Sequence, residues 1–142
     1  MEAAATAQPR ADVGRNLHAA ERCVRLAARV VDAPIALFVS TGGPHPGPVL
    51  SHGAPSGWAA GWERTLAARL RARLADAGAS VVEEHAAELL PIPVACAAVP
   101  VCGPSGRVVG VLAALDPRTR GWPAAAAELL REVAALAGAS LG

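Results

Sequence analysis

The chain has 142 residues, a formal net charge of +1, and 53% hydrophobic but only 3% aromatic residues. This length supports one compact domain with one core, and the near balance of 13 basic and 12 acidic residues lacks the positive excess of a typical nucleic-acid-binding domain. Since no apolar run approaches the roughly 20 residues that cross a bilayer, we expect a small soluble domain that binds neither nucleic acid nor membrane.

The N-terminal segment, residues 1–15, is rich in alanine and polar side chains and has no continuous apolar stretch, so it is not typical of a secretory signal. We expect a flexible tail over residues 1–15 and a single domain over residues 16–142. A chain of this kind is expected in the cytoplasm.

The beginning of the domain predicts a helix and a β-hairpin. Apolar residues recur every three or four positions from Leu17 to about Val31, which is typical of a helix with one buried face. The helix is expected to stop at Asp32-Ala33-Pro34. The apolar run Ile35–Ser40 predicts a strand, and a Gly- and Pro-rich loop separates it from a second short strand, Val49–His52.

The middle of the chain predicts one substantial helix and one strand. The helix spans Trp58–Ala77 and carries Trp62, Leu66, Leu70 and Leu74 on one face. A third strand follows over Ala79–Glu84, and His85 comes directly after it.

The last part of the chain predicts a hairpin and a closing helix. The strands Val94–Cys102 and Arg107–Leu115 are joined by the short turn Gly103–Gly106. Trp122-Pro123 opens the final helix. Antiparallel hairpins with segregated helices indicate an α+β domain, in which helices pack on an open antiparallel sheet of about five strands.

The cysteines Cys23, Cys96 and Cys102 match neither a Cys-X-X-Cys pair nor a Cys/His metal-binding spacing. Along an extended strand, Cys96 and Cys102 are separated by about 20 Å, far beyond the roughly 7 Å that a disulfide allows between Cα atoms. We therefore expect reduced thiols, each acting as a small buried hydrophobic residue.

The segment Pro100–Trp122, with sequence PVCGPSGRVVGVLAALDPRTRGW, strongly resembles the C-terminal half of GAF domains. The upstream segment Ala27–Val39 resembles the first helix and first strand of the same family, especially of its actinobacterial sensory members. The resemblance implies a GAF/PAS-like fold with the N- and C-terminal helices packed together on one face of the sheet. It also implies a small-ligand pocket on the opposite face, and a role in regulating an attached output domain.

The ligand pocket that the resemblance implies is expected near Phe38, His52, Trp58, Trp62, His85 and Cys96. His52 and His85 close two predicted strands, and a histidine there could ligate haem iron or bind an anion, because its charge changes near neutral pH. Trp58 and Trp62 lie four residues apart on one helical face and could stack on a planar ligand. The alternative is that the histidines face solvent and the tryptophans only pack the helix against the sheet.

Catalytic constellations are not found in this sequence. Adjacent strand residues point to opposite faces, so of Glu83 and Glu84 only Glu83 is expected to share a face with His85. No Ser-His-Asp or His-Glu-X-X-His pattern is present. Cys23 belongs to the first helix, on the side away from the implied pocket, so attachment of a bilin there is not expected.

Two surfaces suggest partners. The predicted middle helix carries four arginines with few acidic neighbours, which form either a solvated face or a docking surface for an acidic protein: Arg64, Arg69, Arg71 and Arg73. The final helix is rich in alanine, so its backbone can closely approach a second copy. We expect a homodimer formed through the terminal helices.

We interpret the chain as a non-enzymatic GAF-like regulatory domain that binds a small molecule or a partner protein. One alternative is a GAF scaffold with a closed pocket that serves only for dimerisation or docking. Another is a small biosynthetic or redox enzyme on this fold, with Cys96 or His85 as its reactive group. The residues identify no cofactor, and with one Phe, three Trp and no Tyr any ligand is expected to be small.

Overall fold

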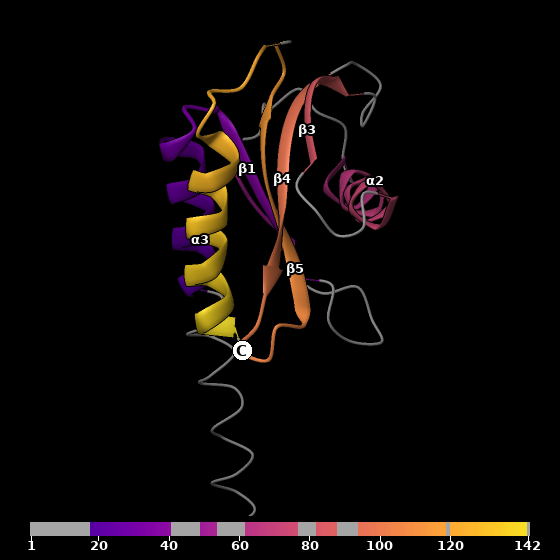
Figure 1. The fold of residues 1–142 in the computed structure, drawn as a ribbon. Helices are drawn as coiled ribbons and strands as arrows, with labels where there is room; N and C mark the ends of the chain where they lie inside the picture. The colour runs from indigo at the N-terminus through magenta and orange to yellow at the C-terminus, as the bar shows by residue number, and fades with distance from the viewer. Residues whose placement is uncertain are drawn as a thin grey trace, which may run out of the picture.

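The computed structural model describes residues 18–40, 49–53, 62–76, 82–87, 94–118 and 120–141. A first helix over residues 18–30 precedes the strands and helices β1 (Ile35–Ser40), β2 (Val49–His52), α2 (Trp62–Asp76), β3 (Val82–Ala87), β4 (Val94–Cys102), β5 (Val108–Asp116) and α3 (Ala126–Leu141). The strands form one antiparallel five-stranded sheet in the order β2-β1-β5-β4-β3. Figure 1 shows the first helix and α3 side by side on one face of this sheet and α2 on the other. The expected α+β architecture is confirmed.

The central strands are buried on both faces, so their side chains divide between two cores. Alternate residues of β1, β4 and β5 point to opposite faces. Ala36, Phe38 and Leu112 belong to the core under the first helix and α3, which we call the helix-side core. Leu37 and Cys96 belong to the core under α2, which we call the α2-side core. Burial on both faces explains why β4 and β5 are apolar almost throughout instead of alternating with polar residues.

The first helix ends in a Schellman motif that turns the chain into β1. The N–H of Ala33 donates to the carbonyl of Ala28 at 2.9 Å, and the N–H of Asp32 donates to the carbonyl of Arg29 at 3.3 Å. Asp32 has a φ of 53°, a left-handed conformation that Asp tolerates better than most residues. The predicted helix stop at Asp32-Ala33-Pro34 is confirmed.

The β4–β5 hairpin closes through a tight turn, as its Gly-rich sequence predicts. The N–H of Gly106 donates to the carbonyl of Gly103, and the N–H of Gly103 donates to the carbonyl of Arg107, both at 2.9 Å. Gly106 has a φ of 83°, the left-handed residue that a three-residue hairpin loop requires. Cys102, at the end of β4, is exposed, so the expectation that every cysteine is buried is wrong at this position. A register shift separates Val101 from Cys102, which lies where the strands leave the core for the turn.

The third strand ends further along the chain than predicted. β3 covers Val82–Ala87, so His85 lies within the strand and does not follow it, while the predicted start at Ala79 lies outside the described residues. The strand is defined by its pairing with β4, which runs from Val82 opposite Ala98 to Ala87 opposite Val94. Such pairing depends on a partner strand distant in sequence, and apolar patterning does not reveal it.

The predicted start of α2 lies outside the described residues, and α3 begins after its predicted start. α2 begins at Trp62, and residues 54–61, which include the predicted start at Trp58, lie outside the described residues. α3 begins at Ala126 and not at Trp122, because the N–H of Ala126 donates to the carbonyl of Pro123 in a turn that precedes the helix.

α3 approaches the sheet closely at Gly138. A Cβ atom added at Gly138 would overlap the main-chain carbonyl oxygen of Cys102. Only glycine therefore lets α3 lie at this distance from the end of β4.

We expect Gly138→Ala to lower the free energy of unfolding by on the order of 1–3 kcal/mol, because the new methyl group must push α3 away from β4. Urea unfolding followed by circular dichroism measures the change. Helix propensity alone would instead stabilise the variant by up to about 1 kcal/mol. A loss of stability therefore indicates that the new methyl group clashes with β4. Gly121→Ala is the control, because a Cβ atom there meets nothing within 4 Å. A Gly138→Ala variant as stable as wild type would contradict the close approach.

Candidate functional site

The residues that the sequence assigns to a pocket do not gather at one place. Trp62 and Cys96 meet in the α2-side core: Cys96 is fully buried, and Trp62 packs half-buried against the edge of the same cluster. Leu66 and Leu70 of α2, both fully buried, fill the space between α2 and the sheet here. Cys96 is thus a buried member of an apolar cluster.

Phe38 and His52 lie on the helix side of the sheet, away from Cys96. The Phe38 ring sits over Gly110, where an added Cβ atom would come within 2.7 Å of the ring. Phe38 therefore anchors the helix-side core and does not line the α2 face. His52 is exposed at the end of β2, in an open cleft of about 190 Å³ that Glu21 and Arg25 of the first helix also line.

Trp58 and His85 are the remaining residues of the predicted pocket. Trp58 lies outside the described residues. His85 lies in β3 between Glu84 and Ala87, where the pairing with β4 shifts register. The expectation that Glu83 shares a face with His85 assumes an unbroken alternation, which this shift interrupts. The register places Glu84, and not Glu83, opposite Cys96.

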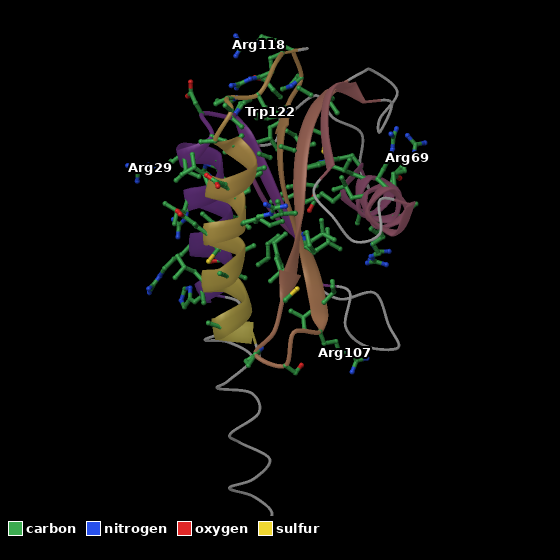
Figure 2. All side chains as sticks on the ribbon, in the orientation of Figure 1. Arg29, Arg69, Arg107, Arg118 and Trp122 are labelled. Carbon is green, nitrogen blue, oxygen red and sulfur yellow. The ribbon has the colours of Figure 1, made fainter. Side chains whose placement is uncertain are left out.

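A polar cluster that the sequence analysis did not identify lies at the end of β5. Asp116 is fully buried, and its Oδ1 accepts the main-chain N–H of Arg118 at 3.0 Å. The Arg118 guanidinium reaches the same carboxylate with Nε at 3.4 Å and Nη2 at 3.5 Å, and Arg120 reaches it with Nη1 at 3.5 Å. Figure 2 shows Arg118 and Trp122 at this end of the molecule. The only signal in the sequence is Asp-Pro followed closely by two arginines, within the segment that resembles GAF domains.

Asp116 remains ionised in this environment. Burial by itself raises the pKa of a carboxyl group, but the hydrogen bonds from the main chain and side chain of Arg118, the Arg118 charge and the hydrogen bond from Arg120 outweigh it. The pKa of Asp116 is therefore lower than its ordinary value.

Arg120 connects this cluster to both terminal helices. Its Nη1 donates to the main-chain carbonyl of Asp32, at the end of the first helix, at 2.7 Å. Its guanidinium lies 4.7 Å from the centre of the Trp122 ring, in a cation–π arrangement. Trp122 is buried in the helix-side core just before α3. The Arg120 side chain thus contacts the end of the first helix and also Trp122, which lies just before α3.

The cluster borders an open cleft of about 540 Å³. Asp32, Ala33 and Pro34 form one part of its lining, and Asp116, Arg118 and Arg120 form the other. A volume of this size is in the range of small-molecule sites. Its polar lining favours a charged ligand over an apolar one.

Metal and membrane sites were also considered for the described residues. No group of three or more His, Cys, Asp or Glu side chains in this part of the chain is placed to hold a metal ion. None of the helices described is both long and apolar enough to span a bilayer.

The architecture is that of a GAF/PAS-like α+β domain, with terminal helices on one face of an antiparallel sheet and a single described helix on the other. The family model for the GAF domain matches residues 16–141. The chain therefore belongs to the GAF domain family. A search of curated protein sequences gives no significant match.

Several solved structures share this fold. The GAF domain/HD domain protein from Geobacter sulfurreducens is 15% identical with a TM-score of 0.67, over 87% of this chain and 90% of that one. The cyanobacteriochrome receptor PixJ is 16% identical with a TM-score of 0.67, over 92% and 95%. An IclR homolog from Microbacterium hydrocarbonoxydans, solved in complex with 4-hydroxybenzoate, is 18% identical with a TM-score of 0.56, over 89% and 68%. At these identities the likeness establishes the fold.

Asp116→Asn removes the buried negative charge and preserves the shape of the side chain. We expect the free energy of unfolding at neutral pH to fall by about 1–3 kcal/mol, because hydrogen bonds to a charged group are stronger than neutral ones. The folded-state pKa of Asp116 lies below the ordinary value of 3.8. The ionised carboxylate therefore stabilises the fold above that value, and its contribution is lost as the pH falls through the folded-state pKa.

Urea unfolding of wild type and Asp116→Asn from neutral to acidic pH tests this expectation, and the two proteins should converge in stability as the pH falls. Arg118→Ala serves as the comparison. The Arg118 side chain is 84% exposed, so solvent screening should limit its loss to less than about 1 kcal/mol. A stability gap between wild type and Asp116→Asn that does not change with pH would contradict the role given to the charge.

Proposed function

We propose that this chain is a cytoplasmic regulatory GAF domain that works as a homodimer formed by the first helix and α3. In this proposal, a small molecule or partner protein bound at the α2 face biases how the terminal helices of the two copies pack. The observation that carries the proposal is the exposed apolar surface of the two terminal helices.

The outer surface of the helix layer contains large apolar side chains. Leu136 of α3 is 58% exposed, and Leu26 of the first helix is 37% exposed. Leu129 lies two turns before Leu136 on the same side of α3, and Val30 lies one turn after Leu26. Leu129 and Val30 are themselves half-buried against the helix-side core. The apolar surface therefore runs from the core to the outside of the layer, which favours a protein partner.

Charge on the same two helices fits a second copy of this chain. The first helix exposes basic side chains, Arg22, Arg25 and Arg29, and Figure 2 shows Arg29 projecting away from the sheet. α3 exposes two acidic side chains, Glu128 and Glu132, and one basic side chain, Arg131, so its exposed charge is acidic on balance. A two-fold axis that places the first helix of one copy against α3 of the other would bring these opposite charges together twice.

Leu136→Glu should shift the protein from dimer to monomer, because the carboxylate would be desolvated at the centre of the interface. The mass is measured by light scattering or sedimentation at concentrations on the order of 10 µM. Ala68→Glu is the matched control: Ala68 is exposed on α2, which covers the opposite face of the sheet, so its variant should stay dimeric. A monomeric wild type, or equal effects of the two variants, would contradict the proposal.

Small-molecule binding at the α2 face is supported by the fold and by one neighbour. The IclR homolog that shares this fold was solved with 4-hydroxybenzoate, a small aromatic acid. In this chain the half-buried ring of Trp62 at the start of α2 offers an aromatic contact at the edge of the α2-side core. Cys96 lies in the same core, and Trp58 and His85 complete the proposed ligand-contact set.

The arginines of α2 support a protein partner at the same face: Arg64, Arg69, Arg71 and Arg73. Arg64 and Arg69 are exposed, and Figure 2 shows Arg69 on the outside of α2. The Nε atom of Arg71 is buried and has no hydrogen-bond partner among the described residues. A buried donor without an acceptor is costly, so an acidic segment that supplied one would gain affinity.

Two experiments distinguish a small-molecule ligand from an acidic protein partner at the α2 face. Native mass spectrometry of protein purified from its own host should show a retained small molecule, and Trp62→Ala should reduce its occupancy. A glutamate-rich peptide should bind with an affinity that falls with salt and that falls further in Arg64→Glu/Arg71→Glu. Arg131→Glu is the control for the peptide, since Arg131 is an exposed arginine of α3, which covers the other face of the sheet. If the mass is that of the protein without a ligand and the peptide does not bind, the proposal of a ligand or partner at the α2 face is wrong. That result would favour the scaffold with a closed pocket.

A further inference from the structure

The cleft at the end of β5 holds two guanidinium groups that share one carboxylate. Each of them forms an ion pair with Asp116, Arg118 at 3.4 Å and Arg120 at 3.5 Å. Asp32 is the other acidic residue of the lining, and its side chain is exposed at the rim. Its contact with Arg120 is made by its main-chain carbonyl and not by its carboxylate. The lining therefore carries two positive and two negative charges, but the Asp116 carboxylate is buried behind the arginines and the Asp32 carboxylate makes no contact with them.

The hydrogen bonds within the cluster leave donors available toward the cleft. Arg118 uses Nε and Nη2 for Asp116, and Arg120 uses Nε for the carbonyl of Gly121 and Nη1 for Asp116 and Asp32. Within the described part of the chain, Nη1 of Arg118 and Nη2 of Arg120 make no hydrogen bond. A planar guanidinium held along one edge presents its other edge to a second anion.

Asp116 acts here as a fixed support for the arginines. It is fully buried, and its Oδ1 is fixed by the main-chain N–H of Arg118 at 3.0 Å. The Trp122 ring supports the Arg120 guanidinium from one side at 4.7 Å. Arg120 is correspondingly only 23% exposed, whereas Arg118 is 84% exposed. One arginine is thus preorganised, and the other is able to close over a bound group.

We propose that this cleft binds a small metabolite bearing a carboxylate or phosphate group, with the oxyanion held by the guanidiniums of Arg118 and Arg120. The volume of about 540 Å³ is large enough for a metabolite that extends beyond the anionic group. The site lies where β1 begins and β5 ends, beside the end of the first helix and the segment that leads to α3. It is separate from the α2 face. It does not depend on the ligand or partner proposed for that face, or on dimerisation.

Titration calorimetry with two probes, inorganic phosphate and succinate, at constant ionic strength adjusted with chloride, tests the site and distinguishes the two anion chemistries. At least one probe should bind with one site per chain. Arg118→Ala should weaken that binding by at least about fivefold, as expected for loss of charge-assisted hydrogen bonds. Asp32→Asn should strengthen binding, because it removes the negative charge at the rim. The indole N–H signal of Trp122 in NMR spectra should shift on binding.

Arg107→Ala is the matched control. Arg107 is an exposed arginine beside the β4–β5 turn, and Figure 2 shows it at the opposite end of the molecule from Arg118. This variant should bind the probes as wild type does, and melting curves verify that each variant is folded. Equal weakening by Arg107→Ala and Arg118→Ala would show non-specific attraction and overturn the proposal. Failure of both probes to bind above the chloride background would overturn it as well.

Discussion

The burial of the central strands on both faces is the constraint on which the rest of this structure depends. β1, β4 and β5 must send alternate side chains into two separate cores. Most of these side chains are small, Ala, Val and Cys in β4 for example, so the layers can approach closely. Gly138 against the Cys102 carbonyl and Gly110 under the Phe38 ring are the places where this approach leaves no room for a Cβ atom.

The same arrangement places two different surfaces on opposite sides of the sheet. The helix layer exposes Leu26 and Leu136 on one side of the sheet, and α2 presents its arginines on the other. Among the described residues, the sheet lies between these two layers. Within the helix layer, Arg120 connects three elements: it donates to the Asp32 carbonyl just after the first helix, pairs with Asp116 at the end of β5 and stacks on Trp122 before α3. A change at that residue reaches both terminal helices directly.

Most of the fold could be predicted because it depends on local patterns. The helix stop at Asp32-Ala33-Pro34 and the Gly103–Gly106 turn are determined by the conformational limits of Pro, Asp and Gly, which act over a few residues. The candidate site was predicted less well. Phe38 was assigned to the pocket face, yet it lies in the helix-side core. Alternation shows that neighbouring residues face opposite ways, but it does not show which set faces which layer.

The sequence by itself determined the α+β class and the order of the elements, because periodicity and turn chemistry are local properties of the chain. The family followed from the resemblance of two segments to GAF domains, which the family model confirms. Only the tertiary structure decided where β3 lies, since its limits follow from pairing with β4. Only the tertiary structure brought Asp116, Arg118 and Arg120 together with Asp32, which is more than eighty residues away from them in sequence. The burial of one carboxylate beside two arginines is a property of packing, and so no pattern in the sequence displays it.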